Sequence, residues 1–467
     1  MGTTVYERQP TARDVIVAAL ENTKLKPFWL DDVTHVERPA LAGDIEADLV
    51  IVGAGYTGLW TAVQAKERDP KRSVVSVEAH TVGWAASGRN GGFCEPSLTH
   101  GYANGVSRWP DEMDTLERLG TLNIDEIEQT VKRYAMDVNF ERNGSLTVAV
   151  EPHQMAELEG GALEGEPVMD ADAIQAKVKS PTYLAAQSDG GDTALVHPAK
   201  LAYELARVAT ELGVAIYENS PVVGIGAGPV VRTANGAVTA KKVVLATNAF
   251  PSLLRRNALM TVPVYDYSLV TEPLTAAQMD SIGWKGREGI ADMGNQFHYY
   301  RLTPDNRILF GGYDAIYHAG GRIKESYEDR SESYEKLAGH FFTTFPQLEG
   351  LKFTHRWGGV IDSCSRFCAF FGVARGGDVA YATGFTGLGV GASRFAAAVM
   401  LDLLSGEETE RTRLQMVKDR PLPFPPEPIA AIGVNMVRWS MNRADHNDGK
   451  RNLLLKTLDK LGMGFDS

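Results

Sequence analysis

The chain has 467 residues, 44% of them hydrophobic and 23% charged, and 59 acidic against 47 basic residues give a formal net charge of −12. This composition is typical of a soluble globular protein and excludes a disordered regulator or a small scaffold. An acidic surface repels polyanions, so nucleic acid is not an expected partner. At about 150 residues per domain, the length predicts two or three domains.

The termini and the cysteines indicate an intracellular protein. No apolar run approaches the roughly 20 residues that span a bilayer, and residues 1–15 lack the pattern of a secretory signal. The three cysteines, Cys94, Cys364 and Cys368, are an odd number, which argues against a disulfide framework. We therefore expect a cytoplasmic protein without a membrane span, in which Cys364 and Cys368 are core residues rather than a redox pair.

The chain alternates between predicted strands and helices. Residues 48–52 form an apolar run that ends at a glycine, 57–68 have helical composition, and 73–77 form a second apolar run, which together predict one strand–helix–strand unit. Further along we expect a helix at 111–134, a hairpin at 140–150 turning at Asn143-Gly144, a helix at 198–212, strands at 214–217, 222–225 and 243–247, an antiparallel sheet within 263–312, a strand at 379–383, a helix at 393–404 and an extended proline-rich segment at 421–428.

A glycine motif separates the first predicted strand from its helix. Gly53, Gly55 and Gly58 have the spacing G-x-G-x-x-G, in which the glycines permit a tight turn, close approach of a pyrophosphate, and close helix–strand packing. Glu78 ends the next strand, 20 residues after Gly58, where a carboxylate can accept hydrogen bonds from both ribose hydroxyls. The sequence therefore predicts a bound dinucleotide with an unphosphorylated ribose, either FAD or NAD.

The loop after Glu78 distinguishes between these two cofactors. Residues 83–92, Gly-Trp-Ala-Ala-Ser-Gly-Arg-Asn-Gly-Gly, combine small residues with polar donors, and together with the glycine motif and Glu78-Ala79 they resemble the D-amino acid oxidase (DAO) family of FAD-dependent oxidoreductases. The resemblance extends from about residue 44 to 430. Phe28-Trp29-Leu30, residues 55–62 and residues 424–428 are most similar to two subgroups, the gamma-glutamylputrescine oxidase-like and the aminophosphonate oxidoreductase-like enzymes.

The resemblance implies an α/β fold, with a discontinuous Rossmann-like FAD-binding domain and an inserted antiparallel-sheet substrate domain. We expect an N-terminal extension at 1–45, an FAD-binding domain from 46–135, 190–260 and 355–415, a substrate-binding domain from 136–189 and 261–354, and a C-terminal extension at 416–467. It also implies that FAD contacts Gly53, Gly55, Tyr56, Thr57, Gly58, Glu78, Ala79, Ala86, Ser87, Arg89, Asn90, Gly91, Gly92, Val222, Val223, Ala246, Thr247, Asn248, Gly384, Gly387, Leu388, Gly389 and Val390. Cys364 is out of register with the flavin-linking cysteine of sarcosine oxidase-like enzymes, so we expect non-covalent FAD.

The implied reaction oxidises the C–N bond of an amine or amino acid derivative. A hydride passes to flavin N5, and the resulting imine hydrolyses, which requires positioning rather than a dedicated catalytic base or a metal. The aromatic-rich second domain supplies the candidate substrate-binding residues Tyr267, Tyr299 and Arg301, although each of these also has a purely structural interpretation. Trp357, in the segment 355–415, is the fourth candidate.

Two departures from the family pattern leave alternatives open. Ile361 stands where glycine oxidase-like members have a carboxylate-binding arginine, which makes simple α-amino acids less suitable substrates. Leu309 stands where sarcosine oxidase-like members have an oxygen-activating lysine. The electron acceptor is therefore dioxygen in an oxidase or a carrier in an amine dehydrogenase, and a flavin-binding redox sensor or assembly subunit without turnover is the remaining alternative.

Overall fold

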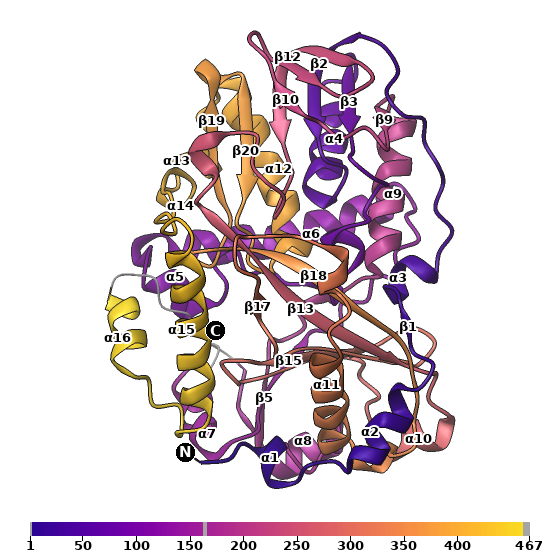
Figure 1. The fold of residues 1–467 in the computed structure, drawn as a ribbon, viewed down its shortest axis with the longest axis vertical. Helices are drawn as coiled ribbons and strands as arrows, with labels where there is room; N and C mark the ends of the chain where they lie inside the picture. The colour runs from indigo at the N-terminus through magenta and orange to yellow at the C-terminus, as the bar shows by residue number, and fades with distance from the viewer. Residues whose placement is uncertain (1, 162–165, 461–467) are drawn as a thin grey trace.

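The computed structural model describes residues 2–161 and 166–460. Within these residues the chain forms two large sheets, one in the upper and one in the lower half of Figure 1. The upper sheet has a parallel centre, and the lower sheet is mainly antiparallel. This mixed α/β architecture is the expected fold class.

The eight-stranded upper sheet contains the predicted strand–helix–strand unit. Its strands are β2 (Ile45–Val52), β3 (Val74–Val77), β9 (Ala215–Tyr217), β10 (Gly224–Ile225), β11 (Val230–Arg232), β12 (Ala237–Leu245), β19 (Phe370–Ala374) and β20 (Val379–Thr383). β2 pairs in parallel with β3 on one side and with β12 on the other, and β20 continues the parallel order beyond β12. β9 also pairs in parallel with β3, so the carboxyl ends of five strands lie along one edge.

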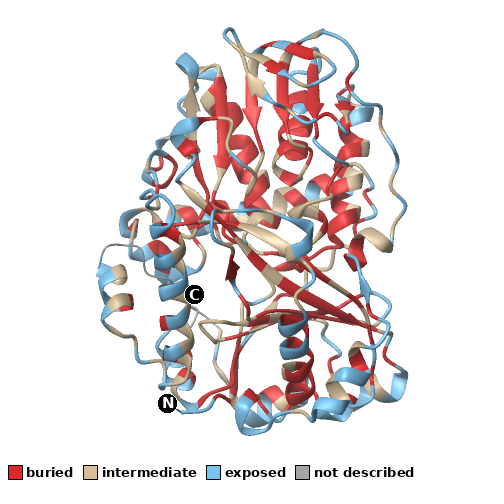
Figure 2. Ribbon diagram, viewed as in Figure 1, coloured by how far each residue is buried: buried red, intermediate tan, exposed pale blue. Residues whose placement is uncertain are grey.

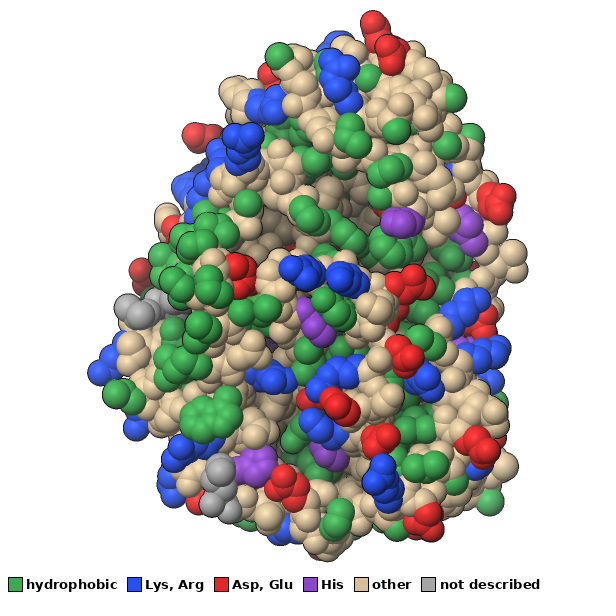
Figure 3. All heavy atoms as spheres, viewed as in Figure 1, with side chains coloured by type: hydrophobic (Ala, Val, Ile, Leu, Met, Phe, Trp, Pro, Cys, Tyr) green, Lys and Arg blue, Asp and Glu red, His purple; other side chains and the backbone are tan. Residues whose placement is uncertain are grey.

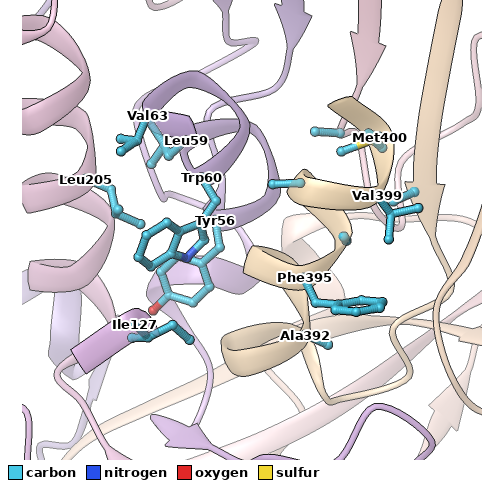
Figure 4. Packing of buried hydrophobic residues seen from close by; sticks show 14 of the residues in the cluster. Tyr56, Leu59, Trp60, Val63, Ile127, Leu205, Ala392, Phe395, Val399 and Met400 are labelled. Atoms are coloured by element: carbon cyan, nitrogen blue, oxygen red, sulfur yellow. The ribbon is translucent and has the colours of Figure 1, made fainter. Parts of the chain in front are cut away.

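Helices cover this sheet and enclose the largest core. They are α4 (Tyr56–Arg68), α6 (Met113–Arg133), α9 (Pro198–Glu211) and α12 (Gly389–Ser405). α4 packs against α9 on one side and α12 on the other. Figure 4 shows Trp60 of α4 beside Leu205 of α9, with Phe395 of α12 across the core. Figure 2 shows the same helices and strands as mostly buried residues.

The ten-stranded lower sheet contains the antiparallel region expected within residues 263–312. Its strands are β1 (Lys24–Leu25), β5 (Ser145–Ala149), β6 (Met169–Asp170), β7 (Ala185–Ser188), β13 (Thr261–Thr271), β14 (Gly289–Asp292), β15 (His298–Leu302), β16 (Ile308–Gly312), β17 (Ile316–Tyr317) and β18 (Phe353–Cys364). α11 (Ser331–Thr344) packs against β13 and β16. β18 runs across the expected domain boundary between residues 354 and 355.

The predicted hairpin at 140–150 is wrong. Only residues 145–149 form a strand, β5, which pairs with β7 and β14 rather than with the preceding segment. Glu141 instead makes an isolated bridge to Leu195. The Asn-Gly pair does precede a strand, but β5 finds its partners far along the chain, which a local turn signal does not reveal.

The remaining elements connect and flank the two sheets. They are α1 (Val5–Arg8), α2 (Arg13–Leu20), α3 (Phe28–Asp31), β4 (Phe93–Cys94), α5 (Tyr102–Val106), α7 (Pro152–Gly160), α8 (Ala171–Lys177), β8 (Ala194–Leu195), α10 (Ala276–Ile282), α13 (Glu410–Arg413), α14 (Gln415–Lys418), α15 (Ile429–Asp445) and α16 (Leu453–Lys460). α2 packs on α11, and α15 lies at the left of Figure 1. Over the described residues, no helix is both long and apolar enough to cross a membrane. The three cysteines are free and buried, which confirms the expectation for Cys364 and Cys368.

Candidate functional site

The glycine motif forms the tight connection from β2 to α4. Gly53 has φ +108°, and a Cβ at this position would lie 2.5 Å from the carbonyl oxygen of Ala246. A Cβ on Gly58 would lie 2.0 Å from the carbonyl oxygen of Gly53. Both contacts are closer than real Cβ atoms tolerate, so the backbone geometry requires glycine at both positions. The first N–H groups of α4 consequently face the edge where the parallel strands end.

Glu78 lies beside this turn, as the dinucleotide motif predicts. Its buried carboxylate accepts hydrogen bonds from the N–H of Ala54 at 2.7 Å, the N–H of His80 at 3.0 Å and Nε1 of Trp84 at 3.1 Å. The N–H of Ser220 donates to the carbonyl oxygen of Glu78 at 2.8 Å, which brings the segment leading to Val222 and Val223 to the same end of β3. Ala79, next to Glu78, is exposed.

The loop of residues 82–92 lies between the glycine turn and the lower sheet, and its polar side chains form hydrogen bonds with other groups of the protein. Ser87 Oγ accepts a hydrogen bond from the N–H of Tyr56 at 2.9 Å, and Asn90 bonds to Ala86, Ser87 and Gly92 of its own loop. Arg89 is directed to the lower sheet, where Nη1 contacts Glu328 Oε2 at 2.5 Å and the carbonyl oxygen of Gly358 at 3.1 Å. These side chains shape the loop, which leaves its backbone as the surface for a flat ligand.

The carboxyl ends of β12 and β20 supply the other predicted FAD contacts. Ala246, Thr247 and Asn248 follow β12, and Gly384 follows the adjacent strand β20. Among the described atoms, Oδ1 of Asn248 is buried and has no hydrogen-bond partner. Gly387 has open space around it, and α12 begins two residues later, at Gly389 and Val390, with Leu388 as its N-cap.

This arrangement fits FAD. A buried amide oxygen without a partner costs free energy unless a ligand donates to it. The N-termini of α4 and α12 both lie at the carboxyl edge of the parallel strands, which is where open α/β sheets bind dinucleotides, and such N-termini stabilise negative charge. The predicted FAD residues are therefore gathered at one edge, although they come from six separate segments.

Strand register decides which predicted substrate residues face this edge. β13 pairs with β18 and β16, and β16 pairs with β15, so that Ser268, Tyr299, Arg301 and Trp357 lie on one face of the lower sheet. Tyr267 lies on the opposite face. Its hydroxyl donates to the carbonyl oxygen of Tyr327 at 2.9 Å, and its ring packs edge-on against Tyr334 of α11. The structure thus separates Tyr267 from the other three candidates.

Arg301 and Trp357 are buried under the loop of residues 82–92. Arg301 Nη1 donates to the carbonyl oxygens of Val196 at 2.7 Å and Gly92 at 3.4 Å, and burial lowers its pKa to about 10. Trp357 Nε1 donates to the carbonyl oxygen of Arg89 at 2.8 Å. Both side chains therefore connect the loop to the sheet.

Tyr299 has a partner that the sequence prediction missed. Its hydroxyl donates to Oδ2 of Asp266 at 2.5 Å and lies 3.2 Å from Oγ of Ser268. Asp266 and Tyr299 are both half-buried, and burial raises the pKa of the Asp266 carboxyl to about 6. The available signal was a single carboxylate in the otherwise apolar and aromatic run of β13.

The Asp266–Tyr299 pair lies where the two halves of the molecule meet. A Cβ on Gly91 would lie 2.8 Å from the Tyr299 ring, and a Cβ on Gly359, opposite Asp266, would lie 3.7 Å from Cβ of Arg89. The surface is hollowed between the upper and lower halves (Figure 3).

Comparisons with known proteins agree with this geometry. The family model described as "DAO: FAD dependent oxidoreductase" matches residues 48–403. The gamma-glutamylputrescine oxidoreductase of Escherichia coli is 33% identical over 386 residues, covering 78% of this chain and 84% of that protein. The probable oxidoreductase OrdL of Haemophilus influenzae is 28% identical over 394 residues, covering 79% and 85%.

Solved structures share the fold. Glycine oxidase from Geobacillus kaustophilus superposes with a TM-score of 0.66 at 19% identity, covering 78% of this chain and 96% of that one. L-proline dehydrogenase from P. horikoshii has a TM-score of 0.63 at 17% identity, covering 79% and 96%.

Proposed function

The chain belongs to the DAO family of FAD-dependent oxidoreductases, and from this membership we propose that it oxidises the C–N bond of an amine or amino acid derivative. The observation that carries the proposal is the contact between the loop of residues 82–92 and the Asp266–Tyr299 face, because it joins a dinucleotide-binding edge to a face with polar groups suited to an amine. The similarity to an enzyme named for gamma-glutamylputrescine supports an amine as the substrate.

We assign FAD binding to the residues predicted from the sequence at the carboxyl edge of the parallel sheet. The α4 N-terminus would hold the pyrophosphate, Glu78 the ribose, and the α12 N-terminus the pyrimidine side of the flavin. We propose that attachment is non-covalent. Burial raises the pKa of Cys364 to about 11, and its Sγ lies 3.2 Å from the carbonyl oxygen of Cys368, so this thiol is a poor nucleophile.

The proposed domain division follows the two sheets. The division expected from the sequence places residues 46–135, 190–260 and 355–415 in the FAD-binding domain and residues 136–189 and 261–354 in the substrate-binding domain, with extensions at either end of the chain. Because β18 spans residues 353–364 and pairs with β13 throughout, we assign the part of it up to Cys364 to the substrate-binding domain in this proposal.

Catalysis would depend mainly on positioning. When bound, FAD supplies the acceptor, at flavin N5, for the hydride that leaves the substrate carbon next to nitrogen. The chain's own residues hold the amine against the Asp266–Tyr299 face and exclude water with the apolar side chains around it. Loss of hydride from the neutral amine leaves a protonated imine, which water hydrolyses to a carbonyl compound and an ammonium ion or protonated amine.

The side chain at position 309 bears on the identity of the electron acceptor. Leu309, at the position where oxidase relatives have a lysine, is buried against Trp29 and Trp357. A buried leucine supplies no charge to stabilise reduced oxygen, so this observation favours a dehydrogenase that passes electrons to a carrier over an oxidase that uses dioxygen.

Anaerobic mixing with amines, amino acids and aminophosphonates tests the function. We expect at least one amine to bleach the flavin absorbance, and the imine-derived carbonyl compound to be recovered in equal amount. Peroxide formation in air, compared with dye reduction, separates oxidase from dehydrogenase. A yellow protein that no member of the panel bleaches would support a redox sensor or an assembly subunit instead.

A further inference from the structure

We propose that Asp266, held by Tyr299, binds the substrate's ammonium group and accepts its proton, and that this carboxylate selects amines without an α-carboxylate. The inference rests on the proposed amine oxidation and adds to it both a residue for the amine and a substrate class. The sequence suggested Arg301 as the residue that binds the substrate and no dedicated catalytic base, and this inference differs on both points.

The geometry leaves Asp266 able to accept a further hydrogen bond. Its Oδ1 accepts from the N–H of Tyr267 at 2.8 Å, its Oδ2 accepts from the hydroxyl of Tyr299 at 2.5 Å, and the backbone N–H of Gly312 also bonds to the carboxylate. A carboxylate has about four acceptor positions, so these three bonds leave one position for a ligand. Its paired residue on the neighbouring strand β18 is Gly359, which has no side chain to cover the carboxylate. Asp266 is half-buried, and Arg89 of the loop of residues 82–92 lies next to Gly359.

The neighbouring charges are paired with one another rather than with Asp266. From β15 the facing group is Tyr299, and from the segment after β16 it is Asp314, whose own charge pairs with Arg330 and Lys336. From the loop it is Arg89, but this guanidinium pairs with Glu328. Arg301, on the same face, is bound to backbone carbonyls. Within residues 2–161 and 166–460, the charge of Asp266 therefore has no cation bonded to it.

The side of the face toward the start of β13 is apolar. Val264 and Ile361 pair directly and are half-buried next to the Asp266–Gly359 pair. An α-carboxylate attached beside the ammonium would have to approach either these apolar side chains or the Asp266 carboxylate, and both lower its affinity through desolvation or repulsion. An alkylamine places only methylene groups there.

The proton step supplies the neutral amine that hydride loss requires. One N–H bond of the ammonium breaks, an O–H bond forms on Asp266, and the electron pair remains on nitrogen. Burial raises the pKa of Asp266 and lowers that of a bound ammonium, so the two groups approach each other in proton affinity. The Tyr299 hydroxyl stabilises the ionised carboxylate and orients it.

Three variants of the flavin-loaded protein test the inference with butylamine, 1,4-diaminobutane and ornithine, which is 1,4-diaminobutane with an α-carboxylate. Asp266→Asn removes the charge at constant shape, and Tyr299→Phe removes one hydrogen bond. Asp292→Asn is the matched control, because Asp292 also accepts from a buried tyrosine, Tyr6, at 2.8 Å, but on the opposite face of the same sheet. Calorimetric binding is measured alongside anaerobic flavin reduction, so that recognition is detected even without turnover.

We expect the wild-type protein to bind the two amines at least tenfold more tightly than ornithine. Asp266→Asn should weaken amine binding about ten- to hundredfold at pH 8, as expected for a lost hydrogen bond to a charged group. In the wild type the reduction rate should rise through a midpoint near pH 6, the Tyr299→Phe midpoint should move to higher pH, and Asp266→Asn should lose the midpoint. Asp292→Asn should behave as wild type.

Each result supports or contradicts the ammonium site at Asp266, the proposed amine oxidation, or both. Amine binding lost in Asp266→Asn without flavin reduction in any variant would support the ammonium site and refute amine oxidation. Flavin reduction that is equally fast, with the same pH profile, in Asp266→Asn would leave the function standing and overturn the inference. Tighter binding of ornithine than of 1,4-diaminobutane, or no amine binding by any variant, would also overturn it.

Discussion

Nη1 of Arg301 lies 2.7 Å from the carbonyl oxygen of Val196, and the same nitrogen reaches the carbonyl oxygen of Gly92. This arginine therefore fastens the loop of residues 82–92 to the lower sheet. Arg301→Ala would leave both carbonyls without this donor, at a cost of about 1–3 kcal/mol for each one left unpaired. We expect a lower unfolding temperature and faster loss of FAD on gel filtration, with a smaller effect on KM.

Arg232→Ala is the control for this experiment, because Arg232 is exposed on β11. Its stability should stay within about 0.5 kcal/mol of the wild type. If Arg301→Ala raised KM strongly and left both stability and FAD retention unchanged, the guanidinium would be facing the substrate, as the sequence first suggested.

Gly58 tests the glycine turn. A Cβ at this position would lie 2.0 Å from the carbonyl oxygen of Gly53, so Gly58→Ala must push α4 away from β2. We expect a folded but less stable protein that does not retain FAD, measured by its flavin-to-protein absorbance ratio. Gly433→Ala, within α15, meets nothing within 4 Å and should raise stability by about 0.5–1 kcal/mol. Normal flavin retention by Gly58→Ala would contradict this account.

The glycine turn was predictable from the sequence, and the substrate face was not, for a physical reason. Gly53 and Gly58 are required by local sterics, which act between residues close in the chain. Which face of the sheet the side chains of Tyr267 and Asp266 occupy depends instead on the register of β13 with β18 and β16, which lie up to about a hundred residues away. β13 is covered on both faces, so its side chains show no polar and apolar alternation from which the register could be read.

The loop of residues 82–92 shows a second limit of prediction from the sequence. The family resemblance implied that this loop lies against FAD, and in the structure Ser87 Oγ accepts a hydrogen bond from the N–H of Tyr56 at the glycine turn. The sequence did not reveal that Arg89 would turn to Glu328, because that partner belongs to the other half of the molecule. Long-range ion pairs of this kind carry no local pattern.

α6 offers a direct comparison of a buried and an exposed leucine on one helix. Leu119 is 5% exposed and belongs to the core shared with α4 and α12, whereas Leu122 is 41% exposed. Leu119→Ala should lower the free energy of unfolding by about 2–5 kcal/mol through lost burial and the cavity left behind. Leu122→Ala should change it by less than about 0.5 kcal/mol in denaturant titrations. Equal losses would mean that α6 does not pack as described.

A buried chain of side chains near the N-terminus predicts a pH dependence of stability. Tyr6 donates to Asp292 Oδ2, which lies 2.6 Å from Nδ1 of His298, whose Nε2 lies 2.9 Å from Nδ1 of His340. Burial, together with the nearby His298 and Lys336, holds the pKa of His340 well below its ordinary value. His340 is thus neutral in the folded protein at pH values where the unfolded chain binds a proton.

The sign follows from this difference in proton binding. The contribution of His340 to stability is complete above about pH 6.5, the value in the unfolded chain, and is lost as the pH falls below it, by about 1.4 kcal/mol per pH unit. His197, with a pKa lowered to about 4 by burial, adds a similar slope, so the comparison between variants is the informative measurement. His340→Asn should reduce the slope of unfolding free energy between pH 6 and 5 by that amount, whatever its stability at pH 8. An identical slope in both proteins would show that His340 takes up its proton while folded.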